Sequence, residues 1–394
     1  MRPTLQFCRA FGLLTGALVV SLAPGCGGAS RVPVRSRTGV AAARAAPAPP
    51  GAPRCEGVAG LPLAERVGQT VVLSFDGPTV PPYVARALRA GEVSGVILFA
   101  DNATGPAQTR ALTAALSRAA GGPALVMLDQ EGGPVRIAPW LGPIAGEAAS
   151  ARSPASIEAG ARRAGRELRR AGITIDLAPV ADVARPSSAL SARAFPGGAA
   201  AVAARTAAMV IGLDAAGIGA TAKHYPGLGA AAANTDAGAV AIARTAGELG
   251  EVDLEPFRAA VAAGVPLVMV GHARYPALDP AAIASQSAPI IEGLLRERLG
   301  FRGVVITDSL EAVAVPRPVA AAALRSLGAG ADLLLTTGRG SFRPVSDRLL
   351  AAARGSAPVR ARLDQAAARV LVLKRRLGLA PPPGTACATT AASR

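Results

Sequence analysis

The sequence predicts an α/β protein whose single catalytic domain is a (β/α)8 TIM-type barrel. Eight short apolar runs alternate with longer helical stretches from residue 60 onward. Most of these runs are continuous in Val, Ile and Leu, as strands covered by helices on both faces are. Eightfold alternation over about 320 residues favours a barrel. An open doubly wound sheet is the alternative, although the lack of a GxGxxG motif after the first run counts against a dinucleotide-binding fold.

The expected strands are defined by these apolar runs. In chain order they are Thr70–Phe75, Gly95–Phe99, Ala124–Leu128, Ile173–Ala178, Gly219–Ala222, Pro266–Val270, Gly303–Ile306 and Asp332–Leu335. Helices are expected between them. One begins with Ser153 as its cap and Pro154 in its first turn, which are common start signals. Another begins at Pro289 and carries apolar residues at helical spacing up to Leu299, where a glycine follows.

Residues 1–26 resemble a secretory signal peptide that ends in a bacterial lipoprotein cleavage box. Arginines precede an apolar run, Phe11–Ala23, which is too short to span a bilayer as a permanent helix. Cys26 follows Ala-Pro-Gly and is the predicted lipidation site, with ordinary signal cleavage near it as the alternative. Residues 27–54, rich in Ala, Pro, Arg and Ser, are expected to form a disordered tether. The barrel is then expected over residues 55–390, in an exported protein that is either anchored to the cell membrane or extracellular or periplasmic.

Charge and cysteine content narrow the expected partners. The net charge is +16, and arginine carries almost all of the positive charge because Lys223 and Lys374 are the only lysines. Aromatic residues make up 3% of the chain and do not alternate with basic clusters, so no nucleic-acid partner is expected. Once the signal is removed and Cys26 is lipidated, Cys55 and Cys387 remain, at opposite ends of the domain. Export favours a bridge between them, and two free thiols are the alternative.

Side chains with catalytic potential follow the expected strands, where barrels of this class carry their active sites. In chain order they are Asp129, Asp182, Lys223, His224, His272 and Asp308. Both histidines of the chain and one of its two lysines lie at such ends. Each residue alone could cap a strand end, but their convergence on one rim favours a function. The histidines lack metal-site spacing, so a metal is weakly supported and no cofactor is implied. Paired carboxylates with Lys, His and Arg suit binding and cleavage of a sugar.

Four motifs stand in a fixed order along the chain. They are Leu128–Gly133 (LDQEGG), Ala222–Gly227 (AKHYPG), His272 followed by Tyr275–Pro280 (YPALDP), and Leu299–Asp308 (LGFRGVVITD). Together they resemble the N-terminal barrel domain of family 3 glycoside hydrolases. The likeness is strongest to the bacterial β-N-acetylhexosaminidases of cell-wall turnover, and it covers about residues 60–378.

The resemblance implies a retaining, exo-acting β-glycosidase whose partner is a carbohydrate, most of all an N-acetylglucosaminide. It places Asp308 at the nucleophile position. It places four residues at sugar-binding positions: Asp129, Arg193, Lys223 and His224. Three further residues are expected to support the site from behind: Asn234, His272 and Arg136.

One loop departs from the family pattern. In the family, the Lys-His motif leads to Pro-Gly-His-Gly and then to Asp-Ser-His, whose Asp–His pair is the general acid/base. Here Leu228 replaces the first His, Asn234 stands at the Asp, and Asp236 stands at the catalytic His. We therefore expect Asp236 to act as acid/base, because an Asp away from cations has a raised pKa. In addition, an Arg of the family falls on Ile137, with Arg136 one place away.

Two alternatives remain open at this point. The altered loop is also compatible with an envelope lipoprotein that binds sugar and has lost efficient turnover. Lys223 could instead form a Schiff base in a barrel lyase or aldolase.

Overall fold

The computed structural model describes residues 55–380, except 123, 144 and 151, together with the pair 386–387. The predicted signal peptide, the lipidation site Cys26 and the tether lie outside the described residues. No helix within the described part is long and apolar enough to cross a membrane.

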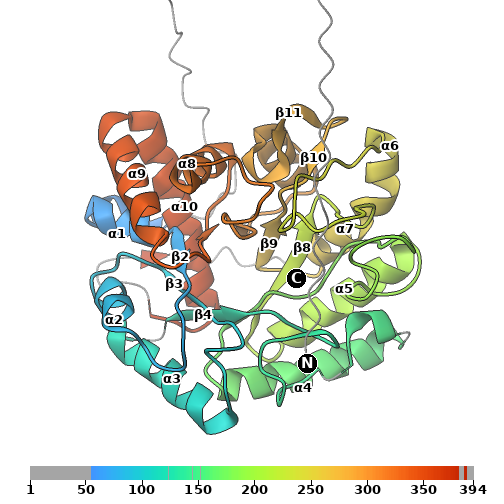
Figure 1. Cartoon of the computed structure of the whole chain (residues 1–394), viewed down its shortest axis with the longest axis horizontal. Coiled ribbons are helices and arrows are strands. Elements are labelled where there is room, and N and C mark those ends of the chain that lie inside the picture. The colour runs from blue at the N-terminus through green and yellow to red at the C-terminus, as the bar shows by residue number, and fades with distance from the viewer. Residues whose placement is uncertain (1–54, 123, 144, 151, 381–385, 388–394) are drawn as a thin grey trace, which may run out of the picture. The chain divides into compact units, whose positions relative to one another are not determined.

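A parallel sheet of eight strands forms the centre of the domain (Figure 1). In spatial order the strands are β12 (Val304–Thr307), β9 (Leu267–Val270), β8 (Gly219–Tyr225), β7 (Ile175–Asp176), β4 (Leu125–Leu128), β3 (Gly95–Ile97), β2 (Val71–Leu73) and β13 (Leu334–Leu335). The outermost two strands meet through a parallel bridge between Ile306 and Leu333, where the Thr307 amide donates to the Leu333 carbonyl over 2.9 Å. The sheet is thus a barrel rather than an open sheet, and each of the eight predicted strands lies in it.

Helices surround the barrel (Figure 1). The longer ones are α1 (Leu63–Gly68), α2 (Pro82–Arg89), α3 (Pro106–Ala119), α4 (Pro154–Arg170), α5 (Ala199–Asp214), α7 (Glu255–Ala262), η5 (Pro289–Arg298), α8 (Val319–Ala329), α9 (Phe342–Gly355) and α10 (Ala357–Arg376). Helical single turns and short segments are η1 (Val58–Gly60), η2 (Glu147–Ala149), α6 (Ala246–Glu248), η3 (Leu249–Asp253) and η4 (Ala284–Gln286). Ser153 caps α4 as predicted, since its hydroxyl accepts from the Ser156 amide. The predicted helix from Pro289 is also present, but it is a π-helix that ends at Arg298.

The core has two layers, because strand side chains alternate between the barrel interior and the surrounding helices. Ile97, Met127 and Met269 belong to the inner layer, which also contains Leu373 of α10 and Leu377 just after it. The α10 side chains enter at the N-terminal ends of the strands. There Lys374 donates to Gln69, just before β2, over 2.7 Å. This end of the barrel is therefore filled, and the opposite end is left for a cavity.

Two-residue strands join the ends of the described domain. β1 (Cys55–Glu56) pairs antiparallel with β14 (Ala386–Cys387), and the register sets Cys55 opposite Cys387. Directly opposed residues of an antiparallel pair lie within the Cα separation that a disulfide requires. The backbone geometry therefore suits the predicted bridge, which stays a prediction.

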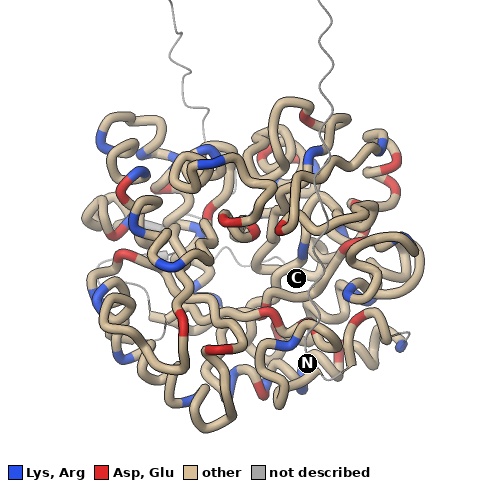
Figure 2. The backbone as a smooth tube through the Cα atoms, in the orientation of Figure 1, with Lys and Arg blue, Asp and Glu red and all other residues tan. Residues whose placement is uncertain are grey.

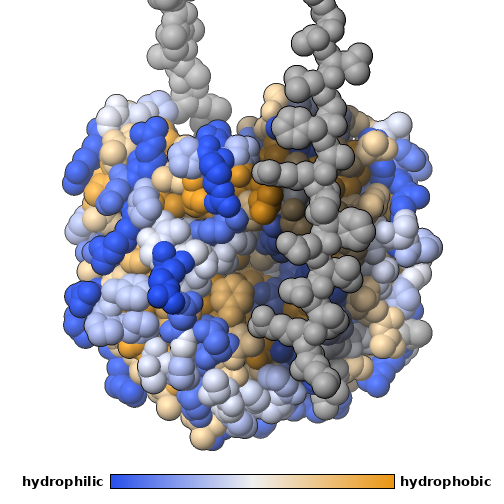
Figure 3. Space-filling model, in the orientation of Figure 1, coloured by the Kyte–Doolittle hydropathy of each residue, from blue (hydrophilic) through white to orange (hydrophobic). Residues whose placement is uncertain are grey.

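Charged residues of both signs are interspersed over the described domain (Figure 2), and apolar patches on the face shown in Figure 3 are separated by hydrophilic residues. The positive net charge is thus not gathered into one continuous basic face in these views. This agrees with arginines that are spread over solvated surfaces.

Candidate active site

A cavity of about 460 Å³ opens at the C-terminal ends of the barrel strands. This volume lies within the range of small-molecule sites. Its floor is apolar and comes from inward-facing strand residues such as Ile97, Met269 and Leu335. Its wall holds most of the predicted site residues: Asp129, Arg193, Lys223, His224, Asn234, Asp236 and Asp308. The structure therefore brings together side chains that are up to 179 positions apart in the sequence.

Asp308 directly follows β12, and its backbone holds it at the edge of the sheet. Its amide donates to the Val270 carbonyl in β9 over 3.0 Å, and its Oδ1 accepts from the Ser309 amide at 2.7 Å. Burial alone would raise the pKa of Asp308, but the nearby His224 and His272 outweigh it, so the pKa lies below its usual range. Asp308 is thus a fixed carboxylate that is ionised at neutral pH, the form that a nucleophile requires.

Lys223 lies at the centre of a buried ion cluster. Its Nζ is 2.5 Å from Asp129 Oδ1 and 2.6 Å from Glu131 Oε1, and only 1% of the lysine side chain is exposed. Arg193 binds both oxygens of Glu131, through Nε at 2.9 Å and Nη2 at 2.6 Å. This fork fixes the plane of the guanidinium, since two parallel hydrogen bonds define one orientation.

The cluster also sets the protonation states of its members. Burial would lower the pKa of Lys223, but Asp129 and Glu131 raise it above its ordinary value. Burial would raise the pKa of Glu131, but Lys223 and Arg193 lower it to about 2. Lys223 is therefore a charged donor, whereas a Schiff-base lysine must present a neutral amine. This geometry argues against the lyase or aldolase alternative.

His224 is oriented by Asp182, which sequence reasoning noted at a strand end without giving it a role. The imidazole Nδ1 is 2.8 Å from Asp182 Oδ2, and that oxygen also accepts from the His224 amide at 3.1 Å. Asp182 Oδ1 accepts from the Leu228 amide at 2.5 Å. In this arrangement the His224 Nδ1–H donates to the Asp182 carboxylate. Nε2 is then the ring nitrogen that is available to the cavity.

His272 supports the strand end that carries Asp308. Its Nε2 donates to the Ser309 carbonyl over 2.9 Å, so its Nδ1 accepts from the Ser285 hydroxyl at 2.8 Å. Burial lowers the pKa of His272, which favours the neutral ring that these two hydrogen bonds imply. His272 is not among the residues that line the cavity, and it contacts the backbone of Ser309 next to Asp308, so its supporting role stays a prediction.

Asn234 and Asp236, from the loop after β8, line the same cavity as Asp308. Asn234 Nδ2 donates to Asp236 Oδ2 over 2.9 Å, and the Asp236 amide donates back to Asn234 Oδ1 over 3.2 Å. The loop is held to the segment after β12, since the Ala314 amide donates to the Thr235 carbonyl over 3.1 Å. Partial burial and the charge of Asp308 raise the pKa of the exposed Asp236 carboxyl. The two carboxyls thus have pKa shifts of opposite direction.

Arg136 lies outside the residues that line the cavity. Its Nη1 donates to the Pro139 carbonyl over 3.1 Å, and its neighbours Val135 and Ile137 line the cavity instead. The tight pairing of β5 (Gln130–Gly132) with β6 (Val135–Arg136) sets this alternation. The wall that the family's arginine would occupy is therefore apolar here.

The structure adds site residues that the sequence did not single out. Glu131 is one, although its position two residues after Asp129 in a strand-end motif was a usable signal. Glu311 is another: it lines the cavity, and its Oε2 accepts from the Thr337 amide at 2.8 Å. Glu311 thereby ties the segment after Asp308 to the segment after β13. No sequence pattern pairs two loops that are so far apart.

Comparison with known proteins identifies the family. The profile described as "Glycosyl hydrolase family 3 N terminal domain" matches residues 63–373. The chain belongs to glycosyl hydrolase family 3. The predicted family membership, the barrel and the general class of glycoside hydrolase are thereby confirmed.

Two relatives of known name are both called beta-hexosaminidase. A "Beta-hexosaminidase" of Xylella fastidiosa strain M12 is 37% identical over 254 residues, which cover 62% of this chain and 76% of the relative. One of Stenotrophomonas maltophilia strain R551-3 is 37% identical over 263 residues, covering 63% and 77%.

Two solved structures share the fold. A β-N-acetylglucosaminidase from Paenibacillus sp. has a TM-score of 0.77 at 34% identity, covering 81% of this chain. This chain spans 63% of that larger one. A β-N-acetylhexosaminidase from Beutenbergia cavernae has a TM-score of 0.74 at 33% identity, covering 80% of this chain and 99% of its own.

Proposed function

We propose that this chain is an exported, retaining β-N-acetylhexosaminidase that releases terminal N-acetylglucosamine from cell-wall-type glycosides. One observation carries the proposal: Asp308 and Asp236 line the same cavity with pKa shifts of opposite direction. Two carboxyls with separated pKa values supply a nucleophile and an acid at one pH. The names of the family 3 relatives support the choice of sugar.

In the first step, an Asp308 carboxylate oxygen forms a bond to the anomeric carbon as the glycosidic carbon–oxygen bond breaks. Asp236 gives its proton to the departing oxygen, so the aglycone leaves as an alcohol. In the second step, Asp236 takes a proton from water, whose oxygen displaces Asp308 from the anomeric carbon. Two displacements at one carbon return the sugar with its original configuration. Asp236 is then protonated again, and Asp308 is again a free carboxylate.

The ion cluster performs recognition. Lys223 and Arg193 are charged donors toward sugar oxygens or the acetamide carbonyl, and Asp129 is an acceptor at the wall of the cavity. His224 Nε2 provides a further polar contact, because Asp182 occupies the other ring nitrogen. The apolar Val135 and Ile137 face the sugar from the side where the family carries an arginine.

The decisive experiment compares an aryl β-N-acetylglucosaminide with the matching aryl β-glucoside. We expect the first to be hydrolysed much faster, with retention of configuration by NMR, and the Asp308→Asn variant to lose the activity. A slow fluorosugar substrate should label Asp308. Labelling of another residue while Asp308→Ala remains active would overturn the assignment.

A second candidate function is a sugar-binding envelope protein. The exposure of the Asp236 carboxyl at the replaced acid/base position favours it, since water is less excluded there than at a buried acid. Calorimetric binding of N-acetylglucosamine, together with no cleavage of either aryl glycoside, would support the sugar-binding function over hydrolysis.

Export and lipid anchoring at Cys26 are part of the same proposal. They rest on the apolar run and the cleavage box at the N-terminus. Mass spectrometry of the mature protein should find a diacylglycerol-modified Cys26 as the first residue. An unmodified first residue beyond Cys26 would instead indicate plain secretion.

A further inference from the structure

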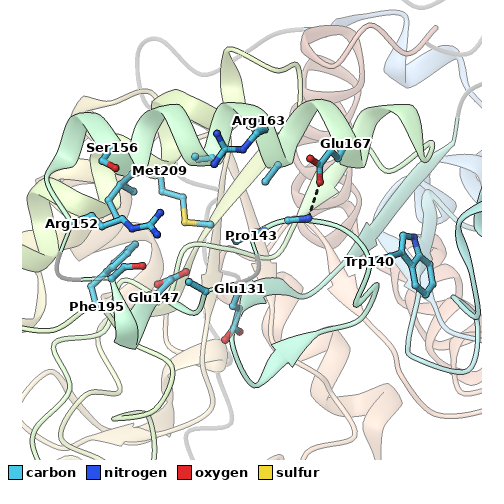
Figure 4. Close-up of a pocket in the computed structure, with 17 residues that line it drawn as sticks. Glu131, Trp140, Pro143, Glu147, Arg152, Ser156, Arg163, Glu167, Phe195 and Met209 are labelled. Atoms are coloured by element: carbon cyan, nitrogen blue, oxygen red, sulfur yellow. Dashed lines mark hydrogen bonds between the residues drawn. The ribbon is translucent and has the colours of Figure 1, made fainter.

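A second cavity, of about 500 Å³, lies outside the barrel beside α4 and α5 (Figure 4). Its walls are largely apolar and include Trp140, Ile157, Phe195 and Met209. Figure 4 shows Arg152 turned inward, toward Met209 and Glu147. The two cavities share no lining residue, although Glu131 of the second cavity pairs with Lys223 and Arg193 of the catalytic cavity, so we treat the second cavity as a separate site.

The acidic groups of this second cavity carry little free negative charge. The Glu131 carboxylate is neutralised by Lys223 and Arg193. Glu147 is 4% exposed, and its two oxygens accept only from the Val180 amide, at 3.2 and 3.1 Å, among the described residues. Burial and the charge of Glu131 raise its pKa well above the ordinary value, which favours the protonated form of this buried acid.

The basic groups, in contrast, are uncompensated. Arg152 and Arg163 both line the cavity, and within the described part of the chain neither guanidinium has a hydrogen-bond or ion-pair partner. A further carboxylate, Glu167, accepts from the Gly142 amide over 2.8 Å, as the dashed line in Figure 4 shows. The cavity thus combines apolar walls, two available guanidiniums and one buried donor acid.

We propose that this second cavity binds a small organic carboxylate with an apolar body. The carboxylate pairs with Arg152, Glu147 donates a hydrogen bond to it, and the apolar body lies against Phe195 and Met209. A single negative charge matches the site better than a phosphate dianion, because the Glu167 carboxylate also lines the cavity. The volume suits a ring or a short acyl chain.

Trp140 provides the measurement, because it is the only tryptophan of the chain and it lines the second cavity. We would titrate the full-length protein with cyclohexanecarboxylate, which does not absorb in the tryptophan band. A saturable fluorescence change with a Kd on the order of 1 mM or tighter is expected for so small a ligand. Cyclohexylmethanol should bind at least about 10-fold more weakly, since it lacks the charge. Cyclohexylmethylamine and cyclohexyl phosphate should also bind more weakly than cyclohexanecarboxylate. The affinity of hexanoate shows whether the cavity prefers an acyl chain or a ring as the apolar body.

Two variants test the location. Arg152→Gln should weaken binding about 10-fold or more, whereas Arg166→Gln, an exposed arginine of α4 that does not line the cavity, should not. Gly160 lines the cavity, and a Cβ there would have no atom within 4 Å. Gly160→Leu should therefore fill the space and abolish binding without lowering Tm, because it replaces a helical glycine.

Three results would overturn the proposal: no saturable response with the parent protein, equal affinity for the alcohol, or unchanged binding to Gly160→Leu. The titration does not depend on hydrolysis. Its failure is therefore distinguishable from a failure of the proposed glycosidase function.

Discussion

Replacement of Asp236 by alanine tests the acid/base assignment most directly. General acid assistance is typically worth about 10²–10⁴ in rate. The Asp236 carboxyl is exposed, and its hydrogen bond comes from Asn234 alone among the described residues. Because this is weak positioning, we expect the lower end of the range, about 10²-fold, or about 2.7 kcal/mol of transition-state stabilisation.

The assay compares two leaving groups. Asp236→Ala should lose about 10²-fold in kcat/KM on an N-acetylglucosamine disaccharide, whose leaving alcohol needs a proton, and lose little on a dinitrophenyl glycoside, which does not. Azide should restore turnover on the aryl substrate, since it attacks without a general base. Asp76→Ala is the control, because Asp76 is an exposed carboxylate outside the cavity whose partner is the surface Arg339. Equal rates for Asp236→Ala and the parent on both substrates would refute the reasoning.

Three further perturbations test charge and covalent structure. Asn234→Ala removes a bond that lowers the pKa of Asp236, so the basic limb of the kcat/KM profile should move to higher pH; a shift to lower pH would contradict this. Burial lowers the pKa of Lys374 from 10.5 to about 8. Between these two pH values the unfolded chain holds more of this proton than the folded chain does, so the free energy of unfolding of the parent rises with pH. Lys374→Met should thus raise unfolding free energy in urea at pH 7, with a smaller gain at pH 10. Non-reducing peptide mapping should find Cys55 bound to Cys387, and reduction should cost about 2–5 kcal/mol of stability.

The barrel could be predicted from the sequence because buried strands require a recognisable pattern of apolar residues. Strands covered on both faces need continuous apolar residues, and runs such as Pro266–Val270 and Gly303–Ile306 meet that need. Because the strands are parallel, the residues that follow their C-terminal ends all lie at the same end of the barrel. The convergence of Asp308 and Lys223 followed from topology alone, without knowledge of any side-chain contact.

The ion cluster could not be predicted to the same depth. Glu131 follows β4 in a short strand that pairs with β6, and only this turn directs its carboxylate to Lys223 and Arg193. The same turn removes Arg136 from the cavity. Such local pairing depends on backbone register, which residue type and spacing do not record. The place of Glu311, bonded to the segment after another strand, is equally a product of the folded barrel.

The way α10 fills the N-terminal end of the barrel has a consequence for turnover under the proposed function. The inner layer is closed there by Leu373 and Leu377, so in the described domain the catalytic cavity has its entrance at the rim. A polymer cannot thread through such a dead end, and each cleavage must be followed by full dissociation rather than processive sliding. The released monosaccharide leaves through the same entrance by which the end of the next substrate polymer must enter. Competitive product inhibition, relieved as the sugar is transported away, is therefore built into the architecture.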